Sequence, residues 1–266
     1  MLKYWGHLIY RWLTPVVDPF KLIYAPPKYI HFFIDWDRYS RINGAERIRI
    51  RDTYPQLYDN TQNTSFDAHC FYQNVWAFKK IYESKVNYHV DVGSHRDFVG
   101  FLSTITKITF IDIRPLVVTL ENFNSKKGNV LSMPLGDNSV PSLSCLSVAE
   151  HIGLGRYGDL LDPFGTKHAC KELSRVLSPN GNLYFSVPVG KARLCFNAHR
   201  IHSPQQIIEY FSDLQLVELS GVDDNGHFIG NIDVSILENS DFAFGLFQFR
   251  KNNCTSLESD ASLRSG

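Results

Sequence analysis

The apolar stretch Val90-Asp91-Val92-Gly93-Ser94 ends in a glycine turn, and a second apolar stretch, Phe110-Ile111-Asp112-Ile113, carries an acid near its end. This order predicts a strand, a tight turn, a helix and a second strand, with Asp112 placed 21 positions after Asp91. In an open α/β sheet, the glycine lets the backbone approach a ligand, and the second acid accepts hydrogen bonds from ribose hydroxyls. These residues therefore predict a sheet that binds a nucleoside.

Strand and helix patterns alternate along the rest of the chain, which predicts a three-layer α/β domain with a mostly parallel sheet. Strands are expected at His89–Val92, Lys107–Ile113, Ser142–Val148, Asn182–Val187, Leu214–Ser220 and Phe242–Phe249. Helices are expected at Phe66–Tyr82, Phe98–Leu102, Leu116–Phe123, Thr166–Leu177 and Pro204–Phe211. Residues 1–60 contain several prolines and are expected to be irregular, and Pro179-Asn180-Gly181 is expected to form a turn.

The helix expected before the first strand has a run of apolar residues at three- and four-residue steps, the spacing of one helix face. That face consists of Phe71, Val75, Phe78 and Tyr82. The same helix holds Tyr72, Gln73 and Trp76. For these three residues, a lid over a bound cofactor and a place in the core are both open interpretations.

The composition excludes several classes of protein. The 266 residues carry 27 basic and 27 acidic side chains, so the overall charge gives no argument for nucleic-acid binding. The five cysteines include no Cys-x-x-Cys pair, which argues against a metal site or a disulfide framework and predicts reduced thiols in the cytoplasm. No apolar run approaches the roughly 20 residues that a membrane span needs.

The first 51 residues differ from the rest in charge. They hold nine Lys or Arg and four acids, a net charge of +5, together with a high share of aromatic residues. One interpretation is a peripheral contact between residues 1–51 and the inner face of an anionic membrane. The other interpretation is an extra helix packed on the domain.

Five segments, in the right order, resemble those of class I S-adenosylmethionine-dependent methyltransferases. They are the glycine loop at 90–94, the ribose-binding acid Asp112, the adenine-contacting segment Asn129–Leu135, the strand end Val148–Ile152, and the helix and turn Glu172–Gly181. The resemblance covers about residues 86–250. It implies a Rossmann-like, mostly parallel seven-stranded sheet, in which Phe242–Phe249 is the one antiparallel strand.

The resemblance also implies a cofactor, S-adenosylmethionine, and the residues that hold it. These are Asp91, Gly93, Ser94, Asp112, Asn129 and Val130. The family usually has glycine at three alternate positions of its loop, which correspond here to Gly93, His95 and Asp97. Because side chains replace two glycines, either the loop follows a different path or cofactor binding is weakened or lost.

A second resemblance indicates a narrower family, and the glycine spacing disfavours one competing fold. Segments 67–73, 153–159, 161–163 and 196–200 resemble a little-characterised family of methyltransferase-like proteins that is often associated with bacterial surface-polysaccharide synthesis. A dinucleotide-binding fold of the NAD type would need glycine at positions 93, 95 and 98. Gly93, His95 and Phe98 stand there, which disfavours that fold.

Candidate catalytic residues follow the expected fourth and fifth strands, where the ligands of α/β sheets bind. His151 is the first choice for a base that takes a proton from a hydroxyl acceptor, and His199 is the second. Glu150 is a further catalytic candidate, and Arg156 or Arg200 could hold a carboxylate or phosphate of the acceptor. A purely structural role for the two histidines is the alternative.

The sequence therefore predicts three regions: a basic-aromatic extension at 1–64, a class I methyltransferase-like domain at 65–250 and a disordered tail at 251–266. The expected activity is methyl transfer from S-adenosylmethionine to a hydroxyl or carboxylate of a sugar-containing or other small acceptor. A non-catalytic protein that uses the same fold as a binding or scaffold component is the alternative.

Overall fold

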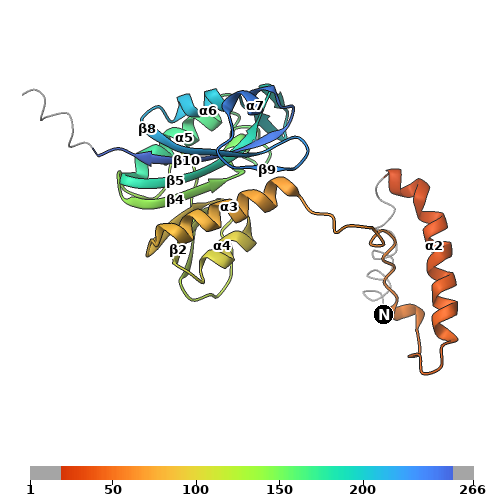
Figure 1. Cartoon of the computed structure of the whole chain (residues 1–266). Coiled ribbons are helices and arrows are strands. Elements are labelled where there is room, and N and C mark those ends of the chain that lie inside the picture. The colour runs from red at the N-terminus through yellow and green to blue at the C-terminus, as the bar shows by residue number, and fades with distance from the viewer. Residues whose placement is uncertain (1–18, 254–266) are drawn as a thin grey trace, which may run out of the picture. The chain divides into compact units, whose positions relative to one another are not determined.

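A computed structural model of the protein describes residues 19–253, which divide into two units between Ser65 and Phe66 (Figure 1). The first 18 residues of the expected basic-aromatic extension lie outside the described residues. The same is true of residues 254–266, which make up most of the expected C-terminal tail.

Unit 1 contains the long helix α2 (Pro19–Ser40) and a short 3-10 turn, η2 (Ile50–Asp52). The prediction that residues 1–60 are irregular is wrong for α2, which continues through Pro26 and Pro27. An internal proline removes a helix hydrogen bond, so sequence rules place a break there. Pairs one turn apart, such as Arg41 with Asp37 at 2.9 Å, support the helix beyond the prolines. No helix among residues 19–253 is long and apolar enough to cross a membrane.

Unit 2 is built on one eight-stranded sheet with the order β3-β2-β1-β4-β5-β10-β8-β9. The strands are β1 (Tyr88–Val92), β2 (Lys107–Asp112), β3 (Phe123–Lys127), β4 (Val140–Leu146), β5 (Leu177–Val189), β8 (Leu214–Val222), β9 (Phe228–Ile229) and β10 (Ala243–Lys251). Strands β1 to β5 pair in parallel, and β10 runs antiparallel between β5 and β8. The mostly parallel sheet with its antiparallel strand is confirmed; the two-residue β9 adds an eighth strand, antiparallel to β8.

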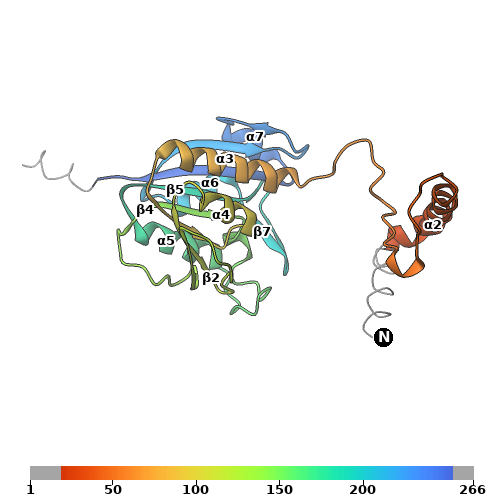
Figure 2. The same ribbon diagram turned by 90° about the horizontal axis from the view of Figure 1, so that it is seen from below.

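Helices cover both faces of the sheet (Figures 1 and 2). One face carries α3 (Ala68–Ser84) and α4 (Arg96–Leu102); the other carries α5 (Gly165–Val176), α6 (Pro204–Tyr210) and α7 (Val234–Asn239). Each face has its own core, with Trp76 and Leu102 buried on the first and Leu173 and Phe211 on the second. The three-layer arrangement therefore follows the expected alternation of strands and helices.

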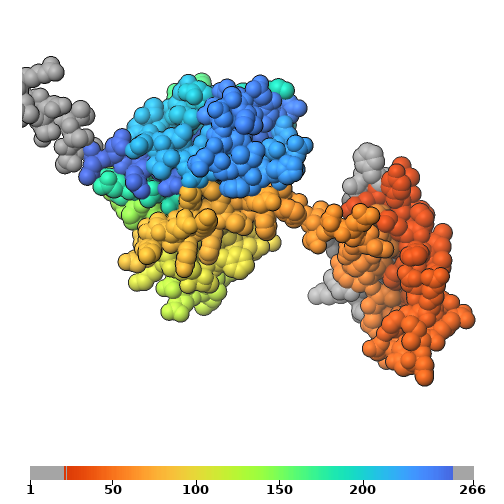
Figure 3. Space-filling view, in the orientation of Figure 1, coloured from red at the N-terminus to blue at the C-terminus, as the bar shows by residue number. Residues whose placement is uncertain are grey.

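Helix α3 packs on the sheet with a different face from the one that the apolar spacing predicts. Its buried residues are Gln73, Trp76, Ala77 and Ile81, whereas Phe71, Val75 and Tyr82 are exposed. In the space-filling view of Figure 3, the orange α3 lies at the surface, between the yellow segment that holds α4 and the blue C-terminal strands. Apolar residues occur on both sides of α3, so the 3.6-residue spacing alone could not identify its buried side.

Two other local predictions need correction. The helix expected at Leu116–Phe123 does not form; Val117 is exposed, and the chain continues into β3, which pairs only with β2. β3 was missed because its sequence, Phe-Asn-Ser-Lys-Lys, is a polar edge strand with no apolar alternation. The expected turn at Pro179–Gly181 lies within β5, where Asn180 has a φ of 60° and the pairing with β4 shifts.

Candidate functional site

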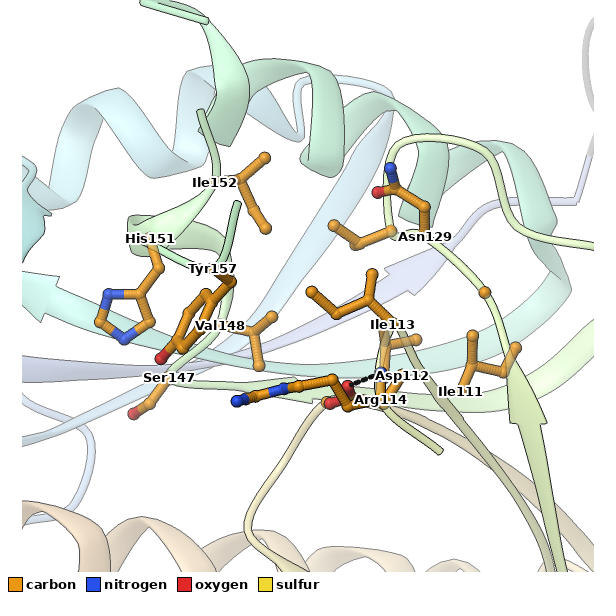
Figure 4. Close-up of a pocket in the computed structure, with 14 residues that line it drawn as sticks. Ile111, Asp112, Ile113, Arg114, Asn129, Ser147, Val148, His151, Ile152 and Tyr157 are labelled. Atoms are coloured by element: carbon orange, nitrogen blue, oxygen red, sulfur yellow. Dashed lines mark hydrogen bonds between the residues drawn. The ribbon is translucent and has the colours of Figure 1, made fainter. Parts of the chain in front are cut away.

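A cleft that is partly open to solvent lies at the carboxyl ends of β1, β2, β3 and β4 (Figure 4). This is the edge at which open α/β sheets bind their ligands. The cleft is lined by Val92, Gly93, Ile111, Asp112, Ile113, Arg114, Gly128, Asn129, Val130, Ser147, Val148, His151, Ile152 and Tyr157. Five of the residues predicted from the sequence therefore meet in one cleft: Gly93, Asp112, Asn129, Val130 and His151.

The glycine loop has the conformation that its sequence requires. Gly93 has a φ of +69°, which favours glycine, and a Cβ atom there would lie 3.2 Å from both methyl groups of Val148. Asp91 and Ser94 do not line the cleft. The Asp91 carboxylate lies behind the loop, accepts a hydrogen bond from the Ser94 backbone N–H at 3.0 Å and is also bonded by the Ser144 hydroxyl. Asp91 thus holds the loop in place and does not touch a ligand in this cleft.

The two side chains that replace the family's glycines turn away from the cleft. His95 caps α4, with its Nδ1 accepting a hydrogen bond from the Asp97 backbone N–H at 3.3 Å. Both His95 and Asp97 are exposed, and neither belongs to the cleft lining. The side chains at the two positions that are usually glycine in the family therefore lie outside the cleft lining.

The acid at the end of β2 points into the cleft. Oδ1 of Asp112 accepts a hydrogen bond from the Arg114 backbone N–H at 2.6 Å, and a Cβ atom built on Gly93 would lie 3.5 Å from Oδ2. Across from it, Oδ1 of Asn129 accepts a hydrogen bond from the Leu131 backbone N–H at 2.9 Å, which fixes the turn after β3. Ile113 and Val130 add apolar wall on this side. A carboxylate that can accept hydrogen bonds from ribose hydroxyls, beside a glycine turn and apolar walls, suits a nucleoside.

His151 lies across the cleft from Asp112, at the end of the short η3 turn (Ala149–His151). Its Nδ1 is 2.7 Å from the carbonyl oxygen of Ala198. Burial and the nearby Arg156 charge, partly opposed by that hydrogen bond, lower the pKa of His151 to about 4. The ring is therefore neutral near pH 7, with Nδ1 protonated and Nε2 able to accept a proton.

Glu150 is buried beside His151 and does not line the cleft. Burial raises the pKa of Glu150 to about 8, so the carboxyl is protonated near pH 7. Its Oε1 lies 3.7 Å from Nε2 of His151, and its Oε2 has no hydrogen-bond partner among residues 19–253. A catalytic role for Glu150 by direct contact with an acceptor does not follow from this position.

The three remaining predicted residues lie in or near the loop that follows η3. Arg200 donates hydrogen bonds to the backbone oxygens of Ile152 and Asp162, so its guanidinium holds that loop and does not face the cleft. Arg156 donates to the Ala198 oxygen at 3.0 Å and lies over the Tyr157 ring. The His199 ring centroid is 6.4 Å from that of His151, outside the cleft lining.

Sequence reasoning missed two features of the site. The Arg114 guanidinium lies 4.7 Å from the centre of the Tyr157 ring, and both residues line the cleft. On α3, Oε1 of Gln73 accepts hydrogen bonds from the hydroxyls of Ser147, at 2.7 Å, and Ser186, at 2.6 Å. Arg114 was detectable as a polar residue after a strand end, but no sequence signal pairs Gln73 with Ser147.

No group of three or more His, Cys, Asp or Glu side chains among residues 19–253 is arranged to hold a metal ion. The four cysteines in this part of the chain are free thiols, and burial raises the pKa of Cys145 and of Cys170. The polar side chains that line the cleft carry carboxylate, amide, imidazole, guanidinium and hydroxyl groups.

Residues 132–227 match the family described as "Caenorhabditis protein of unknown function, DUF268". No protein with a curated description matches the chain.

Among solved structures, the chain is similar to the N-methyltransferase NodS from Bradyrhizobium japonicum WM9 in complex with S-adenosyl-l-homocysteine. The identity is 13%, the match covers 83% of this chain and 98% of NodS, and the TM-score is 0.51. A 1,6-didemethyltoxoflavin-N1-methyltransferase from Burkholderia thailandensis, with bound 1,6-didemethyltoxoflavin and S-adenosylhomocysteine, has 14% identity, 90% and 93% coverage, and a TM-score of 0.48. At such identities the likeness shows the fold alone. The domain has the Rossmann-like α/β fold of class I S-adenosylmethionine-dependent methyltransferases.

Proposed function

We propose that unit 2 binds S-adenosylmethionine in the cleft and catalyses methyl transfer to a hydroxyl or carboxylate of a small acceptor. The observation that carries the proposal is the position of Gly93 and Asp112 on one wall and of His151 on the other. The polar wall fits the nucleoside half of the cofactor, because Asp112 Oδ2 faces the glycine turn and can accept hydrogen bonds from ribose hydroxyls.

When bound, S-adenosylmethionine supplies an electrophilic methyl group on a positively charged sulfur. The chain's own residues then need to orient the acceptor and, for a hydroxyl, to remove its proton as the new bond forms. His151 would accept that proton at Nε2, because its Nδ1 is bonded to the Ala198 oxygen. A carboxylate acceptor is already ionised near neutral pH and would need positioning only.

The residues that line the cleft between Asp112 and His151 also support methyl transfer at this site. Val148 and Ile152 line the side of the cleft that lies between Asp112 and His151, so the space where a methyl group would move has an apolar wall. Arg114 and Arg156, both stacked on Tyr157, give this end of the cleft a positive charge that suits an anionic or phosphorylated acceptor. The proposal includes a sugar-containing acceptor only because segments of the sequence resemble a family associated with surface-polysaccharide synthesis.

Calorimetric titration of the full chain with S-adenosylhomocysteine tests the proposal. One-to-one binding in the micromolar range is expected, and acceptor screening with sugar and carboxylate compounds would follow. A folded protein that shows no binding would favour the non-catalytic alternative, in which the fold serves as a binding or scaffold component. His95→Ala provides a control, because its side chain lies outside the cleft and its removal should leave binding in place.

A peripheral membrane contact through unit 1 is a second candidate function. On α2, Ile23, Tyr24 and Ile30 are exposed, together with the basic Lys21. Exposed apolar and basic side chains on one helix suit an anionic lipid surface. Flotation of the full chain with anionic vesicles, compared with an Ile30→Asp variant, tests this candidate; equal recovery of the two proteins would count against it.

A further inference from the structure

Two loops beside the cleft expose five large apolar side chains. In the segment that follows Tyr157, Leu160 is 90% exposed, Leu161 is 71% exposed and Phe164 is 61% exposed. In the hairpin of β6 (Arg193–Cys195) and β7 (His199–Ile201), Leu194 is 55% exposed and Phe196 is 71% exposed. We call these five residues the loop rim. Single exposed apolar residues are ordinary, but a group on two loops marks an interaction surface.

The two loops are joined into one surface by specific hydrogen bonds. Arg200 on β7 donates to the backbone oxygen of Asp162 at 2.7 Å, and Arg156 donates to the oxygen of Ala198, between β6 and β7, at 3.0 Å. Phe164 and Leu194 line the same hollow. The β6–β7 hairpin projects from the domain in Figure 2. The two loops are therefore held together by side-chain-to-backbone hydrogen bonds, and each contributes an exposed apolar residue to one hollow.

The charge around the rim is positive. Lys167 and Arg193 line the same hollow as Phe164, and neither forms a salt bridge within the described part of the chain. Asp159 and Asp162, which flank Leu160 and Leu161, are the acids of these loops, and the basic side chains of the same loops outnumber them: Arg156, Lys167, Arg193 and Arg200. Basic side chains beside exposed leucine and phenylalanine complement a surface that is apolar inside and anionic outside.

We propose that the loop rim, together with Lys167 and Arg193, docks unit 2 onto an anionic lipid bilayer. Leu160, Leu161 and Phe196 would enter the boundary between headgroups and acyl chains, while the two cations contact lipid phosphates and carboxylates. A second apolar surface, lined by Phe71, Phe78 and Phe101 between α3 and α4, lacks this charge, because Lys79 and Asp97 lie there together. The proposal concerns a surface of unit 2 and does not depend on methyl transfer or on α2.

Vesicle flotation of the full chain tests the docking surface. The wild type is expected to float with vesicles of mixed phosphatidylcholine and phosphatidylserine, and less with phosphatidylcholine alone or in high salt. Leu160→Asp with Leu161→Asp should lower the fraction bound to anionic vesicles by about tenfold, because two apolar side chains leave the bilayer. Lys167→Glu with Arg193→Glu should lower binding to anionic vesicles and leave binding to neutral ones unchanged.

The matched control is Phe101→Asp, which changes an equally exposed apolar residue of unit 2 on α4, outside the rim. This variant should float like the wild type. The proposal is overturned if the wild type does not float, or if the rim variants and Phe101→Asp bind vesicles equally. It is also overturned if light scattering shows the rim variants converting an oligomer to a monomer without loss of flotation, because the rim would then contact a second copy. Near-ultraviolet circular dichroism of each variant establishes that it is folded.

Discussion

The ring of His151 is oriented by Ala198, whose carbonyl oxygen lies 2.7 Å from Nδ1 across 47 residues of chain. Ala198 belongs to the connection between β6 and β7, so a hairpin outside the main sheet fixes which nitrogen of the cleft histidine carries the proton. The remaining nitrogen, Nε2, then has its lone pair available. This contact links the position of the hairpin to the chemistry of the cleft.

Replacement of His151 tests its assignment as the base. His151→Phe is expected to slow methyl transfer to a hydroxyl acceptor by about 10²- to 10⁴-fold, because no other neutral base lines the cleft in residues 19–253. Affinity for S-adenosylhomocysteine should change much less. His199→Gln should retain most activity, because His199 lies outside the cleft lining. An unchanged rate in His151→Phe would instead indicate an acceptor that needs no base, such as a carboxylate.

The pH dependence of that reaction provides a separate test. Because burial and Arg156 lower the pKa of His151 to about 4, methyl transfer should stay constant from neutral pH down to about 5 and fall only below it. Arg156→Gln removes a positive neighbour, so the acid limb should move to higher pH. The measurement is the rate at saturating cofactor and acceptor across this range. A limb near the ordinary histidine value in the wild type would contradict the burial of the ring.

The assignment of the cofactor site depends mainly on Asp112. Asp112→Ala should lower affinity for S-adenosylhomocysteine by about 10²-fold or more, since two hydrogen bonds to a charged acceptor are lost. Asp97→Ala is the control, because Asp97 is exposed and outside the cleft. Calorimetric titration of both folded variants measures the effect. Equal affinity of Asp112→Ala and wild type would overturn the site.

Because Glu150 is buried, we expect the free energy of unfolding to depend on pH. Its pKa is raised by burial to about 8 in the folded protein, above its ordinary value of 4.5. The buried carboxyl therefore contributes stability that is fully present below about pH 4.5 and is lost as the pH rises through about 8. Glu150→Gln mimics the neutral form, so its free energy of unfolding relative to wild type should improve between pH 5 and about 8.5.

Urea denaturation at the two pH values measures this difference. Glu121→Gln, at an exposed site, should show the same difference from wild type at both values. A Glu150→Gln variant with a pH-independent difference would show that the carboxyl is hydrated in the folded protein.

The orientation of α3 can be tested by paired truncations. Ile81→Ala should lower the free energy of unfolding by about 2 to 5 kcal/mol, because Ile81 is buried on the sheet. Val75→Ala should change it by about 0.5 kcal/mol or less, since Val75 is exposed. Gln73→Leu should cost about 1 to 3 kcal/mol, because the Ser147 and Ser186 hydroxyls lose their acceptor. Similar costs at positions 75 and 81 would contradict the described packing.

The sequence was most informative where one local pattern had one structural solution. The β1 strand, Gly93 and Asp112 were predictable because a left-handed glycine between a buried strand and a helix has few alternatives. β3 and the face of α3 were not predictable by the same rules. Both depend on which neighbours cover them, and tertiary contacts override local patterns there.

Some residues of the candidate site were predictable from the sequence, and others were not. Asn129 and His151 follow strand ends, so the topology brings them to the cleft. Asp91 and Arg200 have residue types that suit ligands, but their polar atoms bind backbone groups of the Ser94 turn and of the Ile152 and Asp162 loop. Residue type and place in the sequence do not reveal which carboxylate or guanidinium is already satisfied by the main chain.

The antiparallel β10 has a consequence for synthesis. It is the last strand of the described chain, yet it lies between β5 and β8 in the middle of the sheet. The half formed by β3, β2, β1, β4 and β5 can pair as it leaves the ribosome. Until Ala243–Lys251 has been translated, β8 can pair only with the two-residue β9 and has no partner on its other edge. The exposed edge of β5 must therefore stay protected from other chains until the final central strand arrives.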